Sequence, residues 1–518
     1  MTDEVPSPRS TERTHAVLTM YQHPLRVKHR ASAGHLGSAV ATVGTHLRRI
    51  ATLIFLVGAA AGLSGCVLAP RATAVEQAKL RSASVPFEKR IEARQLPVLP
   101  TPASWQDVLH RAFLANGDLE SSYFVWKAAL ANIDVAATWP NSDATVTFGY
   151  LFSAANMKSW NRTSISGGFS PAVPLKLPIK TAVAGKVALE AAREAGETFQ
   201  TEKFSLQRQV LQIYLDLALA EEKIRIERDN LDILTLLTKS AASRAQTGGP
   251  LQDLLKAQVG QRLAQNDLKD FEFRAAALRG ILNGLMARKG DAPIALPPRL
   301  PSPRPVTAND AKLIAVAVDQ NPELAGLARQ VAGRQDALEL ARLAYLPDII
   351  PSAGLTGSVS QAIGAMIMLP TTLPAIRGAI EEATAMQRSS EAILRQTRSD
   401  RAASFIANLY LMRNAERQTA FYRRSVVPAA RQLLNASEQE YASGAVAFAD
   451  LIDSERTYIS VRFLVAESRI DREKRLADLE ALAGVDIETL GQPARPGTVG
   501  PRPASTELPL PQYGRSTP

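Results

Sequence analysis

Cysteine and histidine are scarce in this 518-residue chain. Cys66 is the single cysteine, and of the six histidines only His110 follows it. Zinc sites of cysteine and histidine, Ser-His-Asp triads and Cys-His pairs need more of these residues than positions 66–518 supply. The sequence also has no P-loop and no glycine-rich dinucleotide fingerprint. We therefore expect no metal, no cofactor and no enzymatic activity. Residue counts do not exclude catalysis by carboxylates alone, but no motif in the sequence indicates it.

The chain also lacks a strong excess of charge. Its formal net charge is +10, and residues 1–65 contribute seven basic and three acidic residues to it. The remaining 53 basic and 47 acidic residues are spread along the chain. Nucleic-acid binding usually requires a concentrated basic patch. We therefore expect no nucleic-acid partner.

A hydrophobic run long enough to span a membrane as a helix is missing as well. The apolar stretch 51–62 follows Arg48 and Arg49 and is shorter than the roughly 20 residues that a spanning helix needs. It leads directly into Leu63-Ser64-Gly65-Cys66. This order of basic, apolar and small residues before cysteine resembles the lipobox of a bacterial lipoprotein signal peptide.

The lipobox resemblance implies a processed lipoprotein. Cleavage would fall between Gly65 and Cys66, and Cys66 would carry covalent lipid, including palmitate. Val67 follows instead of aspartate, which by the same resemblance favours the outer membrane. Residues 1–65 are thus predicted to be an N-terminal extension with a signal peptide. The alternative, a buried free cysteine behind a core helix, is less favoured.

The rest of the chain is predicted to contain a duplicated unit, with repeats at 66–290 and 306–487. A proline-rich linker at 291–305 separates them, and a proline-rich tail at 488–518 is predicted to be disordered. Six pairs of marks recur in the same order. They are Asn116-Gly117-Asp118-Leu119 with Asn321-Pro322-Glu323-Leu324, Trp139-Pro140 with Leu346-Pro347, Ile213-Tyr214 with Leu409-Tyr410, Gly248 with Gly444, Asp253-Leu254-Leu255 with Asp450-Leu451-Ile452, and Leu282-Asn283-Gly284 with Leu482-Ala483-Gly484.

Each repeat is predicted to contain a helix, two extended segments, a very long helix, a tight turn and a returning helix. The first helix is expected over 104–138, ending before Pro140. Alternating side chains predict strands at 144–152 and 352–360, with a weaker strand at 163–170 and an apolar one at 363–369. Such alternation suits a membrane strand or a half-buried strand of a soluble protein equally well.

The long helices carry a seven-residue repeat of apolar side chains. From about 180 to 246 the chain has no proline, and Val210, Leu217, Ile224 and Leu231 keep the heptad step. Sustained heptads predict coiled-coil packing over about 100 Å. Gly248-Gly249-Pro250 and Gly444 are expected to end the long helices, because glycine suits the left-handed position that closes a helix.

Four strands are too few to close a membrane barrel, which starts at about eight strands. In lipid every backbone polar group must be paired, so membrane strands of this chain would need strands from other copies. Three copies would supply about twelve strands. A soluble coiled-coil rod is the alternative, and it needs no membrane strands.

The layout as a whole resembles the TolC-like outer membrane efflux proteins, in their lipoprotein branch, over about 101–485. The stretches at 213–218 and 441–457 are the most family-like. The resemblance implies a mainly α fold with membrane β-strands, in which duplicated long helical hairpins form a trimeric α-barrel tunnel below a shared 12-stranded outer membrane β-barrel. It further implies a homotrimer in outer membrane lipid that extends into the periplasm and docks with a periplasmic adaptor and an inner-membrane pump.

Under this resemblance the protein is a passive efflux conduit. The turns at Gly248, Gly249 and Gly444 are expected to contact the adaptor. Asp450 and Asp453 are candidates for an acidic constriction, although helix capping is the favoured role for aspartate at these positions. The alternative function is a lipid-anchored periplasmic coiled-coil scaffold without a channel. A lipoprotein hydrolase using two carboxylates is disfavoured, since long heptad helices offer few concave sites.

Overall fold

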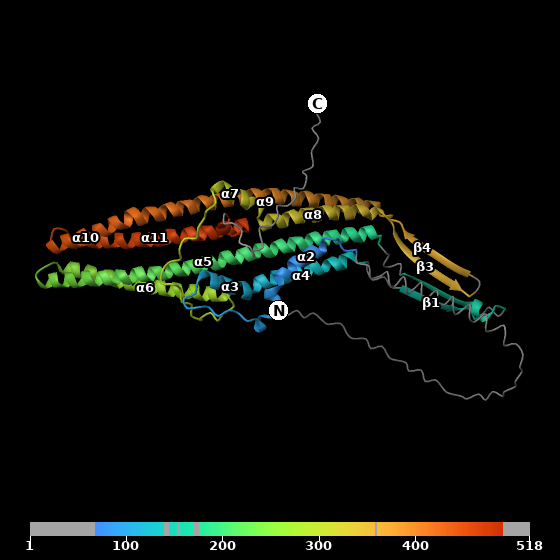
Figure 1. Ribbon diagram of the computed structural model, residues 1–518, viewed down its shortest axis with the longest axis horizontal. Helices are drawn as coiled ribbons and strands as arrows, with labels where there is room; N and C mark the ends of the chain where they lie inside the picture. The colour runs from blue at the N-terminus through green and yellow to red at the C-terminus, as the bar shows by residue number, and fades with distance from the viewer. Residues whose placement is uncertain (1–67, 139–143, 153–155, 170–175, 358–359, 491–518) are drawn as a thin grey trace, which may run out of the picture. The chain divides into compact units, whose positions relative to one another are not determined.

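The computed structural model describes residues 68–138, 144–152, 156–169, 176–357 and 360–490, which are mainly helical (Figure 1). Gly65, Cys66, Trp139-Pro140 and the tail from 491 onward lie outside the described residues. Among the described residues, no helix has an apolar stretch of sufficient length to cross a membrane.

In the described part of the predicted first repeat there are five helices and two strands, whereas the sequence predicts three helices and two strands. Its helices are α2 (Thr73–Ser84), α3 (Trp105–Ala115), α4 (Gly117–Ala137), α5 (Pro178–Gln246) and α6 (Leu251–Leu285), with strands β1 (Ala144–Tyr150) and β2 (Thr163–Phe169) between α4 and α5. Short 3-10 turns occupy Val85–Phe87, Ile91–Ala93 and Ser159–Arg162.

The second repeat follows the same plan. Its elements are α7 (Asp310–Asp319), α8 (Pro322–Arg342), β3 (Asp348–Thr356), β4 (Ser360–Met368), α9 (Leu373–Phe421), α10 (Val427–Ser443) and α11 (Phe448–Ala483). A π-helical turn at Tyr422–Val426 joins α9 to α10, and 3-10 turns occupy Leu343–Tyr345 and Ile487–Thr489. Pro428 explains the π turn, since proline has no N–H to donate to the carbonyl one turn earlier.

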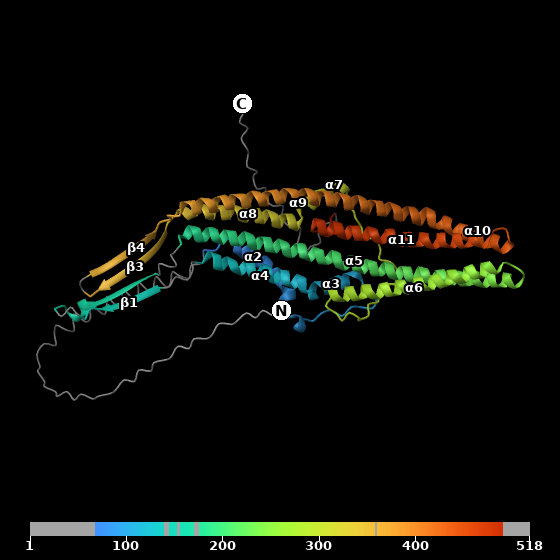
Figure 2. The ribbon, with the colours of Figure 1, turned by 180° about the vertical axis from the view of Figure 1, so that it is seen from behind.

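Helix α5 is the centre of the helical packing. It contacts α4 and α8 along one part of its length and α6 and α11 along the other, as Figures 1 and 2 show. The heptad positions Val210, Leu217 and Ile224 are at most 4 % exposed. The predicted long helix and its apolar seam are therefore confirmed. Helices α5 and α6 form one hairpin, and α9–α10 with α11 form the other.

The single helix predicted over 104–138 is wrong. Asn116 has an extended backbone, with φ −72° and ψ 127°, and separates α3 from α4. Its N–H donates to Ala112 O and ends α3, while its side-chain Oδ1 accepts from the N–H groups of Asp118 and Leu119. Asn321 caps α8 in the same way, by accepting from Leu324 N–H at 2.9 Å. The matched asparagines of the two repeats are thus matched helix caps.

The four strands form one antiparallel sheet in the order β1-β2-β3-β4. The central pairing joins the two repeats, with Ser164 opposite Thr356 and Gly168 opposite Ser352. Strand β3 ends at Thr356 and not at the predicted 360, because Gly357 turns with φ +48°. A Cβ at 357 would lie 2.4 Å from the backbone of Trp160 and Asn161, so this turn requires glycine.

Segment 291–305 has neither helix nor strand, yet one of its side chains is deeply buried. Arg304 Nε lies 3.2 Å from Glu473 Oε2, and its guanidinium lies 2.8 Å from Glu480 Oε2 and 3.3 Å from Glu488 Oε1. Burial raises the pKa of Glu480 to about 7, and the Arg304 charge opposes that rise. Arg304 therefore ties this segment to α11 through a buried charge cluster.

Candidate functional site

The sheet has one apolar face and one face of small and hydroxyl side chains. Residues directly opposite each other in paired strands share a face, so Phe148 aligns with Ile165, and Ile165 aligns with Leu355. The apolar face carries Val146, Phe148, Ile165, Ala353, Leu355, Ile363 and Ile367, with Thr163 near one end. Small and hydroxyl side chains predominate on the other face, which carries Thr147, Ser164, Ser166, Ser352, Gly354, Thr356 and Ala362, with the apolar Ile350, Met366 and Met368 at the end near Asp348.

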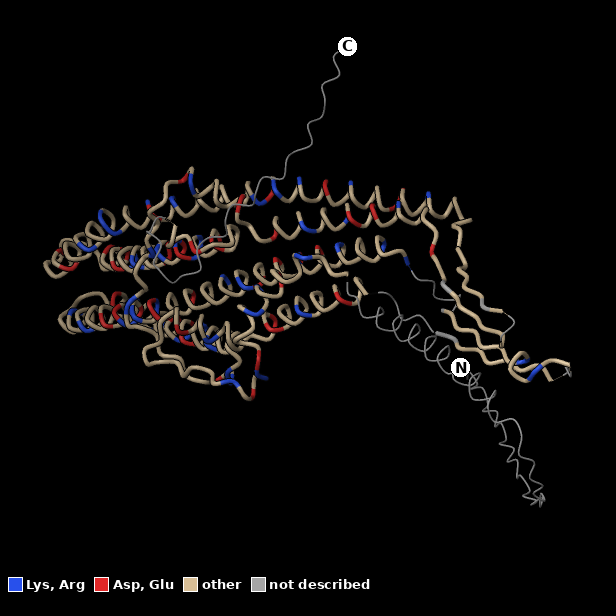
Figure 3. Tube along the Cα trace, turned by 45° about the vertical axis from the view of Figure 1, so that its right-hand side comes forward, with Lys and Arg blue, Asp and Glu red and all other residues tan. Residues whose placement is uncertain are grey.

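The apolar face of the sheet is not used as a core within the described chain. Phe148 is 69 % exposed and Ile363 is 95 % exposed. Among the described residues, no helix covers the sheet in Figures 1 and 2, and Figure 3 shows charges along the helices but almost none on the strands. Asp348, at the start of β3, is the only charged residue in the four described strands, and it pairs with Lys180 at 2.9 Å. An uncharged apolar surface of this kind indicates a lipid or protein partner.

Both edges of the sheet are open among the described residues. Strand β1 pairs only with β2, and β4 pairs only with β3. An edge strand presents unpaired backbone N–H and C=O groups, which form a template for another strand. The sheet therefore has two complementary features, an exposed apolar face and two edges that can continue the hydrogen-bond ladder.

The two hairpin ends have matching turns. Gly248 has φ +96°, and Gly444 has φ +82°. In each turn the next residue donates back to the carbonyl five positions earlier, Gly249 to Arg244 O and Ala445 to Glu440 O, both at 2.8 Å. These are Schellman motifs, which explains why glycine occupies both left-handed positions. Gly249 is constrained too, because a Cβ there would lie 2.8 Å from Arg244 O.

The two hairpin ends contact each other through Tyr441. The Arg244 guanidinium lies over the Tyr441 ring at 4.4 Å, and the Tyr441 hydroxyl lies 3.5 Å from Asp253 Oδ2. Tyr441 is 3 % exposed and packs on Phe448 at 5.3 Å between ring centroids. A cavity of about 480 Å³ lies between the two turns, lined by residues that include Gly248, Gly249 and Gly444. We call Arg244, Asp253 and Tyr441 the tip latch.

The three predicted aspartates near the turns differ in their surroundings. Asp253 belongs to the tip latch and lies in the first turn of α6. Asp450 lies in the first turn of α11, where its Oδ2 accepts from Ala447 N–H at 3.3 Å, so it has the capping role that we favoured. Asp453 is exposed, and its carboxylate has no hydrogen-bond or ion-pair partner among the described residues.

Sequence reasoning found the turns but missed Arg244 and Tyr441. Tyr441 and Asp253 are 188 residues apart, and no local pattern reports a contact across that distance. The matched order of the two repeats was the available signal, since it predicts that equivalent turns lie at the same end of the molecule. In the described residues, no group of three acidic, histidine or cysteine side chains is arranged to bind a metal.

Comparison with known proteins places this fold among outer membrane channels. VceC, an outer membrane protein of Vibrio cholerae, has a TM-score of 0.62 at 15 % identity, over 74 % of this chain and 96 % of that chain. CusC, which forms a transmembrane channel, has a TM-score of 0.62 at 16 % identity, over 77 % and 97 %. The open state of the MtrE outer membrane channel of Neisseria gonorrhoeae has a TM-score of 0.60 at 16 % identity, over 74 % and 89 %.

No family model and no curated protein matches the sequence. The structural similarity shows that the chain shares the fold of VceC, CusC and MtrE. The predicted resemblance to the TolC-like proteins is thereby confirmed at the level of the fold.

Proposed function

We propose that this protein is an outer membrane channel of an efflux system, a passive conduit without covalent chemistry. The observation that carries the proposal is the sheet, which joins an exposed apolar face, a hydroxyl-bearing face and two open edges. A barrel built from such strands would present apolar side chains to lipid and small polar ones to its lumen. The fold shared with VceC, CusC and MtrE supports this assignment.

A homotrimer follows from the strand count under this proposal. Each chain contributes four strands to the sheet. Three copies joined through β1 and β4 would supply about twelve strands, enough to close a barrel and leave no edge unpaired. The six hairpins of the trimer would continue as a helical tunnel into the periplasm.

The assembly can be tested by imaging the detergent-extracted protein and by recording currents across planar bilayers. We expect threefold hollow particles with a helical part about 100 Å long. We also expect stepwise ion conductance from the purified protein. Solid rods or single chains without conductance would refute the channel.

Two further parts of the proposal concern attachment and partners. Lipid on Cys66 would tether each copy to the periplasmic leaflet of the outer membrane, in addition to the hold that membrane strands would provide. Mass spectrometry of the mature N-terminal peptide tests this, and an unmodified peptide from the membrane fraction contradicts it.

A periplasmic adaptor and an inner-membrane pump would supply the cargo and the energy, with the adaptor bound at Gly248, Gly249 and Gly444. Cross-linking from these turns tests the contact.

Opening of the tunnel would separate the two hairpin ends, and the tip latch would oppose it. Replacing Arg244 with glutamine removes a cation–π contact worth about 0.5–2 kcal/mol per protomer. We therefore expect Arg244→Gln to raise the conductance of the purified channel severalfold. Lys239→Gln is the matched control, since it removes an exposed positive charge from the same helix, and it should leave the conductance unchanged. Equal conductance in both variants would exclude the latch.

The acidic constriction is a separate proposal, and the structure distinguishes its two candidates. Asp450 already accepts a capping hydrogen bond, whereas Asp453 is exposed and unpaired in the described chain. Three copies of Asp453 near a threefold axis would favour cations. We therefore expect Asp453→Ala to reduce the cation selectivity of single channels more than Asp450→Ala. Unchanged selectivity and conductance in both variants would reject the ring.

A further inference from the structure

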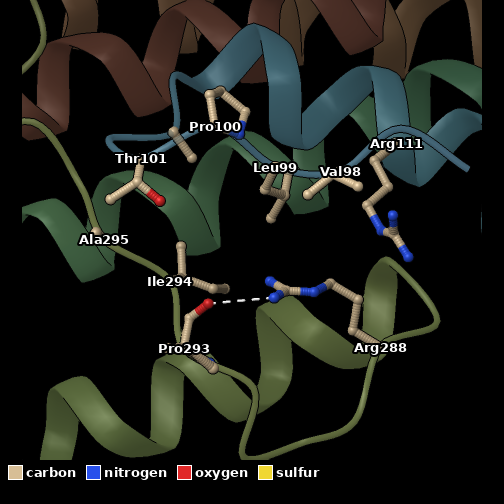
Figure 4. A pocket seen from close by; sticks show the side chains of 10 residues that line it. Val98, Leu99, Pro100, Thr101, Arg111, Arg288, Pro293, Ile294 and Ala295 are labelled. Carbon is tan, nitrogen blue, oxygen red and sulfur yellow. Dashed lines mark hydrogen bonds between the residues drawn. The ribbon is translucent and has the colours of Figure 1, made fainter.

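A second cavity, of about 280 Å³, lies far along α6 from the hairpin ends. It is formed by the segment before α3, by α3 itself and by the segment that follows α6 (Figure 4). Ala103 N–H donates to Ala295 O at 2.9 Å and joins two of these segments. Asn283 Nδ2 on α6 donates to Gly290 O and Ala292 O and holds the segment that follows α6 against that helix. The cavity is therefore held by hydrogen bonds on both sides.

Two arginines enter this cavity from opposite sides. Figure 4 shows Arg111 extending from α3 and Arg288 extending from the segment after α6 towards Pro293, with Leu99 and Ile294 on the adjoining wall. Arg111 donates to Pro97 O, and Arg288 donates to Asn283 Oδ1 and Pro293 O. All these acceptors are neutral, and neither guanidinium has an ion pair among the described residues. We call this the two-arginine pocket.

The lining of the two-arginine pocket includes two positive charges and no negative charge. Burial and the nearby Arg288 charge lower the pKa of Arg111. The Arg111 Nε–H is buried without an acceptor. The charged residues of the adjoining segment, Lys289 and Asp291, are exposed and do not line the cavity. An anion that accepts hydrogen bonds from both guanidiniums would stabilise the neighbouring charges of Arg111 and Arg288.

We propose that the two-arginine pocket binds a small oxyanion, a carboxylate or phosphate group. The anion would lie between Arg111 and Arg288 and accept hydrogen bonds from both guanidiniums. The walls formed by Val98, Leu99 and Ile294 would cover an apolar part of the ligand. The cavity is at the small end of ligand pockets, which suits a small acid or a single phosphate group.

The proposal is tested by isothermal titration of the full-length protein in detergent with inorganic phosphate and with benzoate. We expect saturable binding of one probe per protomer at constant ionic strength. Arg111→Gln and Arg288→Gln should each weaken it at least about tenfold, because each removes a charged donor. Arg90→Gln, which removes an exposed arginine outside the pocket, should leave the affinity unchanged.

The two probes separate the two chemistries. Binding of phosphate alone identifies a phosphate site, and binding of benzoate alone identifies a carboxylate site with an apolar wall. Arg288 is half-buried at a helix end, so its variant is expected to fold even if Arg111→Gln does not. No saturable binding of either probe, or equal affinity in Arg288→Gln and wild type, would overturn the proposal.

Discussion

Ile363→Arg is expected to reduce the amount of inserted trimer in the outer membrane at least about tenfold. Ile363 lies on the apolar face of the sheet near the middle of β4. An arginine facing lipid at mid-membrane costs about 2–4 kcal/mol per copy, and a trimer would incur this cost three times. The measurement is the fraction of protein that fractionates as trimer with the outer membrane.

Ala362→Arg is the matched control for this experiment. Ala362 is the preceding residue of β4 and lies opposite Gly354, on the face of small and hydroxyl side chains. An arginine there would face the lumen, so insertion should stay near wild type while conductance falls. The scaffold alternative predicts a different result, because Ile363 is 95 % exposed in the single chain and exposed substitutions change stability by about 0.5 kcal/mol or less. Normal insertion of Ile363→Arg would therefore favour the scaffold.

Arg304→Met is expected to lower the free energy of unfolding by about 3–5 kcal/mol at pH 8, because it leaves buried carboxylates without their cation. The side chains of Glu473 and Glu480 are 3 % and 1 % exposed. The measurement is the denaturation midpoint followed by circular dichroism. Arg228→Met is the control, since Arg228 and Glu272 form an exposed pair that contributes about 1 kcal/mol or less.

The deficit of Arg304→Met should depend on pH. In the folded protein the pKa of Glu480 is raised from its ordinary value of 4.5 to about 7. A raised pKa means that the carboxyl favours folding below pH 4.5 and that this contribution is lost as the pH rises towards 7. Loss of the Arg304 charge raises the pKa of Glu480 further. The deficit of the variant should therefore be smaller at pH 5 than at pH 8 by up to about 1.4 kcal/mol, which is the effect of one carboxyl titrating over one pH unit. A deficit that does not vary with pH would exclude this explanation.

The features that the sequence predicted are those with a local cause. Heptad spacing placed α5, alternation placed the strands, and glycine marked Gly248 and Gly444 as helix ends. The features that it missed depend on distant partners or on competition between local preferences. The break at Asn116 needs a cap to outweigh a continuous helical pattern, and the end of β3 depends on the close approach of Gly357 to Asn161.

The residues of the candidate site also divide into those with a local sequence signal and those whose contacts depend on distant parts of the chain. The turn glycines could be predicted from helix-ending rules, whereas Arg244 and Tyr441 could not, since their contact joins two repeats. The buried role of Arg304 was hidden by its place in a proline-rich segment that reads as a linker. Its partners, Glu473 and Glu480, are on a helix far along the chain.

The pairing of β2 with β3 sets the order in which the molecule can fold. Ser164 cannot pair with Thr356 until Thr356 has been synthesised. The whole α5–α6 hairpin is therefore synthesised before the sheet can be completed. Contacts of such long sequence separation form slowly. Until then the β1–β2 hairpin presents Val146 and Phe148 on an incomplete, aggregation-prone sheet. The interval between the synthesis of β1 and the pairing of β3 with β2 is therefore the stage at which we expect the chain to aggregate most readily.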